Sequence, residues 1–293
     1  MTKRNPLTDY YNDTYEKQPQ AYPGIQSEMK PVPDCGETSY KGNDKLKGKK
    51  ALVTGGDSGI GRAAAIAYAK EGADVAINYI SDEQADAEDV KKVIEEAGQK
   101  CILIPGDLRD REFPKKLVEQ AYKALEGLDI LVLNAGMQQY EYDIQNLAEE
   151  NLRDTFEVNV FAGVSIVQEA LNYLESGSSI IFTSSIQGVK PSQHLVDYAM
   201  TKSCNISITI SLAAQLGEKG IRVNCVAPGP VWTPLQISGG QPQENIPNFG
   251  KNQPLQRAGQ PVELADVYVL LASDNASFIT GQVYGVTGGS PIN

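Results

Sequence analysis

The stretch Ala51-Leu-Val-Thr-Gly-Gly-Asp-Ser-Gly-Ile-Gly-Arg62 sets the expectations for the fold. It reads as a short apolar strand, a turn rich in glycine, and the beginning of an alanine-rich helix. Glycines let the backbone approach a ligand closely, and the free N–H groups at the start of a helix attract an anion. A strand, a glycine turn and a helix in this order predict a site for the pyrophosphate of a dinucleotide.

The same alternation of strand and helix continues to the end of the chain. The expected strands are 51–54, 74–79, 101–104, 129–133, 179–183, 221–226 and 282–284, and the expected helices are 59–71, 82–97, 111–125, 148–175, 195–217 and 261–272. Apolar strands that alternate with helices predict an α/β fold, namely one doubly wound, seven-stranded parallel sheet with helices on both faces. This dinucleotide-binding catalytic domain is expected to span 48–293.

Two segments depart from this pattern. Residues 229–260 are rich in proline and glycine, so we expect a long loop that serves as a lid over the carboxyl edge of the sheet. Residues 1–47 hold five prolines, five tyrosines and seven residues of each charge, with no helical or strand period. They form an N-terminal extension, the arm, which is disordered or partly docked; the tyrosines favour docking.

Composition excludes several functional classes. A chain of 293 residues with 41% apolar and 22% charged residues is an ordinary folded protein. Its net charge of −11 repels phosphate backbones, so no nucleic acid partner is expected. No apolar run approaches the roughly 18 residues of a membrane span and no signal peptide is apparent, so a cytoplasmic location is expected. Four scattered cysteines, Cys35, Cys101, Cys204 and Cys225, and one histidine predict no metal site.

Four polar residues stand out after the glycine turn. Tyr198 and Lys202 are four residues apart, on one face of the expected helix 195–217. A tyrosine titrates near pH 10, and a neighbouring cation is expected to lower its pKa toward the range useful for proton transfer. Ser185 follows the strand 179–183, where its hydroxyl would face the crevice at the sheet's carboxyl edge. Asn159 interrupts an apolar helical segment, where a buried amide needs partners.

Together with the glycine turn, these residues resemble the short-chain dehydrogenase/reductase family over residues 48–293. The resemblance implies a Rossmann-type fold, an NAD or NADP cofactor, and hydride transfer between the nicotinamide and a carbonyl or alcohol substrate. It implies that Tyr198 is the general acid/base and that Asn159, Ser185 and Lys202 complete the catalytic set. It also implies a homotetramer assembled through the long helices. One departure is Leu133, where the family commonly has a second asparagine.

The resemblance further implies which residues contact the cofactor. They come from the glycine turn, the ends of the second to fourth strands, the catalytic helix and the start of the lid: Gly55, Asp57, Ser58, Gly59, Ile60, Gly61, Tyr79, Asp107, Leu108, Asn134, Ala135, Gly136, Tyr198, Lys202, Pro228, Gly229, Val231 and Thr233.

The choice between NAD and NADP stays open in the sequence. The position after the second strand that commonly holds an aspartate in the family holds Tyr79, and the position that frequently holds an arginine has Ile80. Asp57 could disfavour a 2′-phosphate, although related loops with the same residue serve either cofactor. Asp82 and Glu83 are interpreted as the acidic first turn of the next helix.

The substrate is also open, and an aldehyde, a ketone, a secondary alcohol or a sugar would fit. Gln187, His194 and Trp232 are candidate substrate contacts. His194 is alternatively a loop residue near solvent, and Trp232 equally fits simple packing of the lid. The main alternative function is a non-catalytic dinucleotide-binding protein with a regulatory or scaffold role, which has no need of Ser185, Tyr198 and Lys202 together. An epimerase or dehydratase is a third candidate, disfavoured by the glycine spacing and the short C-terminal part.

Overall fold

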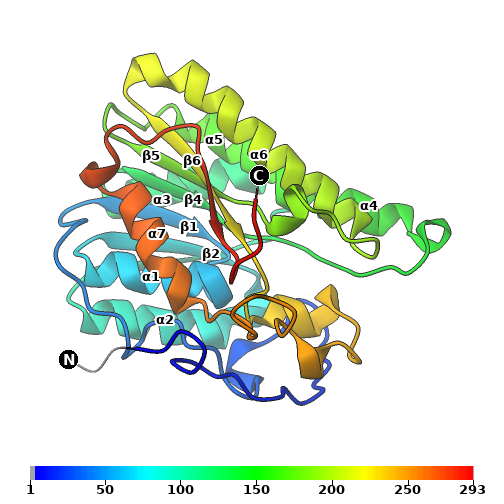
Figure 1. The fold of residues 1–293 in the computed structure, drawn as a ribbon. Helices are drawn as coiled ribbons and strands as arrows, with labels where there is room; N and C mark the ends of the chain where they lie inside the picture. Colours follow the sequence, from blue (N-terminus) through cyan, green and yellow to red (C-terminus); the bar gives the residue numbers. More distant parts are fainter. Residues whose placement is uncertain (1–3, 293) are drawn as a thin grey trace.

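The computed structural model describes residues 4–292, and within them seven strands form one parallel sheet (Figure 1). The strand order is β3-β2-β1-β4-β5-β6-β7. The strands are β1 (Lys50–Thr54), β2 (Asp74–Tyr79), β3 (Cys101–Pro105), β4 (Ile130–Leu133), β5 (Ser179–Thr183), β6 (Arg222–Pro228) and β7 (Val283–Val286). The order reverses between β1 and β4, so the carboxyl ends of these two strands flank the crevice in which doubly wound folds bind ligands.

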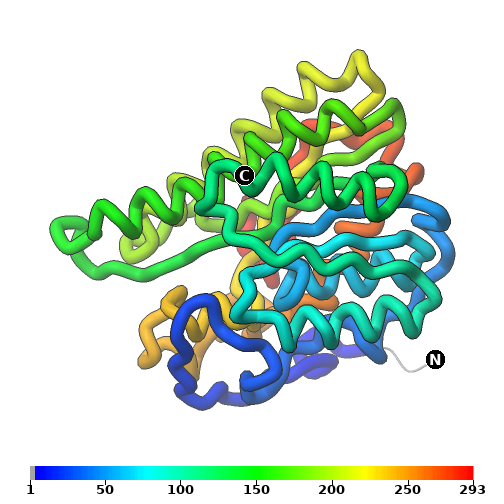
Figure 2. Tube along the Cα trace, turned by 180° about the vertical axis from the view of Figure 1, so that it is seen from behind, coloured from blue at the N-terminus to red at the C-terminus, as the bar shows by residue number. Residues whose placement is uncertain are grey.

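Helices cover both faces of the sheet. One face carries α1 (Gly59–Lys70), α2 (Gln84–Glu96) and α7 (Val262–Ala272), and the other carries α3 (Phe113–Leu125), α5 (Ala162–Ala170) and α6 (Val196–Leu216). Helix α4 (Glu149–Phe156) lies beside the first part of α6, as both views of the chain show (Figures 1 and 2). The predicted doubly wound sheet of seven parallel strands with helices on both faces is therefore confirmed.

The helix expected over 148–175 is divided. It consists of α4, the π-helical turn η4 (Glu157–Phe161) and α5, which ends at Ala170. The π turn contains Asn159, whose side chain is held by hydrogen bonds to a neighbouring loop and to α6. Single π turns inside helices are frequent at functional sites, and the regular 3.6-residue pattern of the sequence did not indicate this one.

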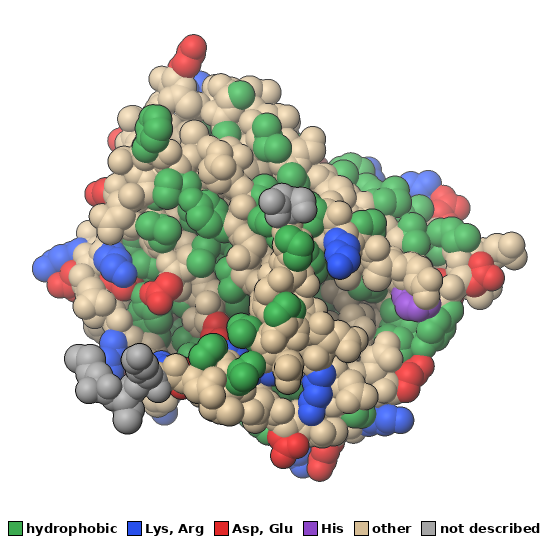
Figure 3. Space-filling view, in the orientation of Figure 1, with side chains coloured by type: hydrophobic (Ala, Val, Ile, Leu, Met, Phe, Trp, Pro, Cys, Tyr) green, Lys and Arg blue, Asp and Glu red, His purple; other side chains and the backbone are tan. Residues whose placement is uncertain are grey.

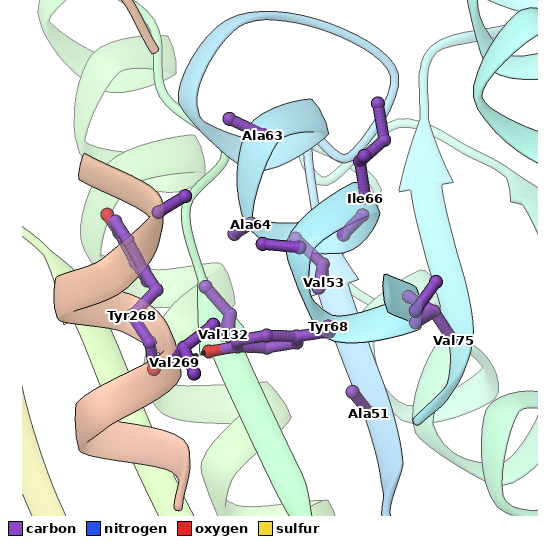
Figure 4. Packing of buried hydrophobic residues seen from close by; sticks show 14 of the residues in the cluster. Ala51, Val53, Ala63, Ala64, Ile66, Tyr68, Val75, Val132, Tyr268 and Val269 are labelled. Carbon is purple, nitrogen blue, oxygen red and sulfur yellow. Dashed lines mark hydrogen bonds between the residues drawn. The ribbon is translucent and has the colours of Figure 1, made fainter. Parts of the chain in front are cut away.

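The core on the α1 side of the sheet is built around one aromatic side chain (Figure 4). Tyr68 of α1 is fully buried, and its hydroxyl donates to the carbonyl oxygen of Tyr268 in α7 at 3.2 Å. Its ring lies among β-branched side chains of β1 and β4, Val53 and Val132. The alanines of α1 let this helix lie close to the sheet, and this fixes the position of the helix N-terminus at the glycine turn.

The arm and the segment 229–260 lie side by side below the sheet in both views of the chain (Figures 1 and 2). They share a third hydrophobic cluster, separate from the two clusters on the faces of the sheet, which consists of Tyr15, Met29, Trp232, Ile237, Ile246, Phe249 and Ala258. Trp232 is at its centre, fully buried, and its ring stacks on Tyr15 with a centroid separation of 3.9 Å. The arm is thus ordered against the segment 229–260 from about residue 5 onward.

The surface carries both signs of charge. On the face shown in Figure 3, acidic and basic side chains lie in small mixed groups around a mostly neutral centre. No helix among residues 4–292 is long and apolar enough to cross a membrane.

Candidate active site

A cavity of about 300 Å³ lies at the carboxyl edge of the sheet. Its walls come from the glycine turn, the ends of β2 to β6, the N-terminal part of α6 and the segment 229–260. Of the predicted cofactor contacts, all but Gly61 line it: Gly55, Asp57, Ser58, Gly59, Ile60, Tyr79, Asp107, Leu108, Asn134, Ala135, Gly136, Tyr198, Lys202, Pro228, Gly229, Val231 and Thr233. The structure therefore brings these residues, which are up to 178 positions apart in the chain, to one hollow.

The glycine turn joins β1 to α1 in a shape that side chains would prevent. A Cβ atom on Gly61 would lie 1.9 Å from the carbonyl oxygen of Gly55, and one on Gly59 would lie 2.9 Å from the side chain of Thr233. Gly59 also has a positive φ of 51°. The N–H of Gly59 donates to Gln26 Oε1 at 2.7 Å, so an anion at this turn would meet the following N–H groups of the first turn of α1, where the helix dipole favours negative charge. Gly61 itself serves the packing of helix against strand.

The end of β4 is fastened to the same turn. The Oγ1 atom of Thr54 accepts hydrogen bonds from the backbone N–H groups of Asn134 and Ala135 at 3.0 and 3.1 Å. The Asn134 side chain donates in turn to the carbonyl oxygens of Thr54 and Gly55. These bonds hold the two strand ends on either side of the crevice at a fixed separation, which a bound dinucleotide requires.

Ser185, Tyr198 and Lys202 converge at the end of β5. Ser185 lies just past the strand, and its Oγ atom accepts from the backbone N–H of Gln187 at 3.1 Å, which fixes the hydroxyl in the cavity wall. Tyr198 and Lys202 are on one face of α6, and the Lys202 Nζ atom is 5.3 Å from the centroid of the Tyr198 ring. Nζ donates to the carbonyl oxygen of Thr183 at 2.9 Å.

Burial dominates the ionisation of this group. It raises the pKa of Tyr198 to about 12, against a smaller lowering by the hydrogen bond with Ser185. It lowers the pKa of Lys202 to about 8, because a buried ammonium loses its hydration. The prediction that Lys202 lowers the pKa of Tyr198 is therefore wrong for the protein without ligand. The ammonium points to the carbonyl of Thr183, and the loss of water around the phenol outweighs its field.

Asn159 lies behind this group, outside the cavity. Its Oδ1 accepts from the backbone N–H of Met137 at 2.7 Å, and its Nδ2 donates to the Met137 carbonyl oxygen at 2.9 Å and to Thr201 Oγ1 at 3.0 Å. Thr201 Oγ1 donates to the carbonyl oxygen of Tyr198. Asn159 therefore joins the loop after β4 to the helical turn that carries Tyr198 and Lys202.

Two buried acids meet at the end of the cavity under the glycine turn. Asp57 and Glu83 are 1% and 8% exposed. Burial raises the pKa of both carboxyls, and for Glu83 the negative charge of Asp57 raises it further. The buried Oδ2 atom of Asp57 has no hydrogen-bond partner among the described residues, and the raised pKa of Glu83 favours the protonated form that could donate to it. Asp82 and Glu83 do lie in an acidic first turn, that of η2 (Ser81–Glu83), but the sequence did not indicate that the Glu83 side chain is buried.

This acid pair makes stability fall with pH. A carboxyl whose pKa is raised on folding binds its proton more tightly in the folded state, so stability is lost as the pH rises above about 5, where ordinary carboxyls are already ionised. Glu83→Gln keeps an acceptor for the Ile80 N–H, 3.1 Å from Glu83 Oε2, and removes the charge. We expect the Tm of Glu83→Gln minus that of wild type to be several degrees larger at pH 9 than at pH 6. The exposed neighbour variant Asp82→Asn should show no such trend, and parallel curves for Glu83→Gln and wild type would contradict the shared proton.

Two predicted cofactor contacts have partners within the protein. The Asp107 carboxylate pairs with Arg109 at 2.6 Å, and Arg109 also reaches Asp154 at 3.0 Å. The hydroxyl of Tyr79 donates to Gln84 Oε1 at 2.6 Å. Both side chains are thereby fixed in the cavity wall on the β2 and β3 side.

Of the three candidate substrate contacts, the structure places one in the cavity wall and two outside it. Gln187 lines the cavity. His194 does not; it lies beside it, with its ring edge-on to Tyr142 at 5.0 Å and its Nε2 3.1 Å from the Gln193 amide. Trp232 also lies outside the cavity wall, and this corrects its candidacy. Its ring turns away to stack on Tyr15, and its Nε1–H donates to the carbonyl oxygen of Pro31 at 2.8 Å.

Other residues line the cavity without having been singled out from the sequence. Among them are Tyr22 and Pro23 of the arm, Asn78 and Glu83 on the β2 side, and Phe249 of the segment 229–260. The tyrosines of the arm were the one available signal, since they indicated docking but not its location.

Comparison with known proteins agrees with this geometry. A family model described as enoyl-(acyl carrier protein) reductase matches residues 55–290. The uncharacterized oxidoreductase YhxD of Bacillus subtilis is 61% identical over 290 residues, which cover 98% of this chain and 97% of the relative. The NADPH-dependent aldehyde reductase 1 of Arabidopsis thaliana is 42% identical, with 95% of this chain and 99% of the relative covered.

A solved structure gives the same result. The short chain dehydrogenase of Burkholderia cenocepacia, determined in complex with NADP, superposes with a TM-score of 0.78 at 33% identity, covering 84% of this chain and 98% of its own. The family model spans most of the chain, and the two relatives are 61% and 42% identical over nearly its whole length. The resemblance seen in the sequence is thus confirmed, and the chain belongs to the short-chain dehydrogenase/reductase family of oxidoreductases.

Proposed function

We propose that this protein is an NAD(P)-dependent oxidoreductase that interconverts a carbonyl compound and the corresponding alcohol, with Tyr198 as the general acid/base. The observation that carries the proposal is the convergence of Ser185, Tyr198 and Lys202 in the wall of the cavity that also contains the glycine turn. A dinucleotide site alone does not require a phenol beside a serine hydroxyl and an ammonium, whereas proton transfer to a carbonyl oxygen uses such a group.

The cavity fits a dinucleotide. The N–H groups of α1 that follow Gly59 suit a pyrophosphate, and the absence of a side chain at Gly59 leaves room for a close approach. The buried Oδ2 atom of Asp57 can accept from a ribose hydroxyl in place of the proton on Glu83. Asn134, Gly136, Pro228 and Thr233 would surround the nicotinamide end, as membership of the family implies; all four line the cavity, and Gly136 lies beside Lys202 Nζ. When bound, the nicotinamide supplies or accepts the hydride.

The protein's own residues would handle the proton and the oxygen atom of the substrate. In the reducing direction the Ser185 hydroxyl donates a hydrogen bond to the carbonyl oxygen, and the Tyr198 hydroxyl delivers its proton to the same oxygen as negative charge develops there. In the oxidising direction the phenolate accepts that proton back. The high pKa of Tyr198 without ligand keeps the phenol protonated, which is the form that reduction requires.

Lys202 would act through its charge and its position. The Nζ–Thr183 hydrogen bond holds the ammonium near the phenol ring, and its remaining N–H groups are free to bind a ribose hydroxyl. Asn159 is a positioning residue that acts through Met137 and Thr201. Because the pKa of Lys202 is lowered to about 8, the fraction of Lys202 that carries a positive charge falls as the pH rises through that value.

The size and lining of the cavity support a small substrate of mixed polarity. The space left beside the catalytic group is bounded by polar Gln187 and Gln138 and by apolar Leu195 and Phe249. A small aldehyde, ketone, secondary alcohol or sugar suits this mixed lining. The Arabidopsis relative named as an aldehyde reductase supports the aldehyde among these.

We also propose that four copies assemble through α4 to α6. The surface of these helices exposes large apolar side chains, Phe161, Val196, Met200 and Ile210. Clusters of this kind are typical of subunit contacts. A monomeric mass in light scattering would contradict the assembly.

Titration with NADH and with NADPH, each followed by nicotinamide fluorescence, tests the proposed function. We expect saturable binding of at least one of them, and turnover of that dinucleotide in a screen of aldehydes, ketones and sugars. Binding without any turnover would favour the regulatory or scaffold alternative. Absence of binding by both would contradict the proposal itself.

A further inference from the structure

The arm reaches the cavity at Tyr22 and Pro23, which both line it. On one side of these residues the arm is fastened to the segment 229–260. The backbone N–H of Gln20 donates to the carbonyl oxygen of Ile237 at 3.2 Å, and Ser238 Oγ donates to the carbonyl oxygen of Pro23 at 3.0 Å. The arm therefore approaches the cavity from the lid.

On the other side the arm is fastened to the glycine turn itself. The Gln26 side chain is buried, and its Oε1 accepts from the backbone N–H of Gly59, at the first residue of α1, at 2.7 Å. The backbone N–H groups of Gln26 and Ser27 donate to the buried carboxylate of Asp86 in α2, at 2.6 and 3.2 Å. Between these two anchorages, residues 22–23 are held over the cavity by contacts to both of its walls.

The surroundings of Tyr22 identify which end of the cavity it covers. The charged groups that act most strongly on its phenol are Arg109, Glu83 and Asp107. Asp107 and Arg109 follow β3, at the edge of the sheet opposite to β6 and β7. Tyr198 and Lys202, in contrast, lie beside the end of β5. Tyr22 is therefore at the end of the cavity remote from the catalytic side chains.

We propose that Tyr22 and Pro23 form a wall of the dinucleotide site that contacts the adenosine half of the cofactor. This inference rests on the proposed function, since it concerns the same cavity. A dinucleotide whose nicotinamide lies at Tyr198 and whose pyrophosphate lies at α1 extends toward β2 and β3 with its adenosine. There it meets the Tyr22 ring and the Pro23 ring on one side, and Ile80 and Leu108 among the other lining residues.

The chemistry of Tyr22 suits this partner. Aromatic side chains stack on the flat face of a nucleic acid base, and a neighbouring proline adds apolar area without conformational freedom. The half-buried Tyr22 side chain lines the cavity and is not part of the hydrophobic cluster formed by Tyr15 and Trp232.

The comparisons agree that the arm is an addition to a complete domain. The Burkholderia structure is matched over 98% of its own length but covers only 84% of this chain, and the unmatched share is about the size of the arm. The Bacillus relative, in contrast, aligns over 290 residues and so includes nearly all of it. This wall is therefore a feature of the chains that carry the arm.

Substitution of Tyr22 tests the proposal. Purified Tyr22→Ala, Tyr22→Phe and wild type are titrated by calorimetry with NADH, NADPH, adenosine 5′-diphosphate and nicotinamide mononucleotide. We expect Tyr22→Ala to weaken the binding of adenosine 5′-diphosphate, and of whichever dinucleotide the wild type binds, by about tenfold. This is the effect of losing one base stack. Tyr22→Phe keeps the ring and should bind within about twofold of wild type. Val32→Ala is the matched control, since this arm side chain is 55% exposed and lies outside the cavity wall.

The outcomes separate the wall from the function. If wild type binds dinucleotide and Tyr22→Ala binds it equally well, the wall is disproved and the proposed function stands. If wild type binds no dinucleotide, both fail. An equal loss for nicotinamide mononucleotide would also overturn the wall, because Tyr22 would then act on the whole site through the fold. Tyr22→Leu, which keeps apolar bulk without an aromatic ring, replaces Tyr22→Ala if thermal unfolding shows that the alanine variant is not folded.

Discussion

Tyr198→Phe is expected to lower turnover by about 10²-fold to 10⁴-fold, the range for losing a general acid/base. The substitution removes one oxygen atom from a buried side chain of α6 and leaves its ring against Lys202. Because Phe has no ionisable group, neither the protonation of a carbonyl oxygen nor its reverse can proceed through this position. Dinucleotide affinity should stay within a few-fold of wild type, since the glycine turn and the wall at Tyr22 are untouched.

The comparison that makes this result specific is Tyr68→Phe. Tyr68 is also a fully buried tyrosine, and its hydroxyl donates to the carbonyl oxygen of Tyr268, but it lies in the core between α1 and α7. Its loss should lower stability by about 1 kcal/mol, the net contribution of a typical hydrogen bond, and leave kcat within a few-fold. Steady-state kinetics with the dinucleotide that wild type binds, together with fluorescence titration, measures both effects. Retained turnover in Tyr198→Phe would remove Tyr198 from its proposed role.

The sheet could be predicted from the sequence because its signals are local. Each buried parallel strand appears as a short apolar run, and the expected bounds of most strands differ from the observed ones by one or two residues, as for 101–104 against Cys101–Pro105. The glycine turn and the spacing of Tyr198 and Lys202 are likewise contained within a few residues of chain. The doubly wound arrangement is one of the few topologies open to such an alternation, whereas the order of the individual strands was not predicted.

The rest of the site depends on contacts between distant segments, which no local pattern encodes. Glu83 stands in the first turn of a helical stretch, where acidic residues are usually solvated, and its burial against Asp57 arises from the fold of β2 on β1. The direction of the Tyr198 pKa shift was missed for the same reason, since burial is a property of the assembled cavity. For Trp232 the sequence left substrate contact and simple packing of the lid segment equally open. The side chain packs against the arm, whose course carried no periodic signal.

Trp232→Ala is expected to lower the free energy of unfolding by about 3–5 kcal/mol, the usual cost of removing a fully buried large aromatic side chain. The indole belongs to the cluster between the arm and the segment 229–260. It stacks on Tyr15, and its Nε1–H donates to the carbonyl oxygen of Pro31. This cluster is separate from the two clusters on the sheet, so the loss falls first on the arm and on 229–260. Denaturant unfolding measures the loss of stability; it is followed by far-UV circular dichroism because the variant lacks the only tryptophan of the chain. Limited proteolysis of the native protein measures local opening.

The exposed aromatic residue Phe278 provides the matched control, since it is 102% exposed and Phe278→Ala should change stability by no more than about 0.5 kcal/mol. Tyr15→Ala and the double variant complete a cycle in which the double variant should cost about 0.5–1.5 kcal/mol less than the sum of the single ones, because both remove the same stacked pair. Since Pro23 is tied to Ser238 in the same segment, loosening of this cluster should also weaken dinucleotide binding. Strict additivity of Tyr15→Ala and Trp232→Ala, with unchanged proteolysis of residues 229–260, would show that the arm does not hold the lid.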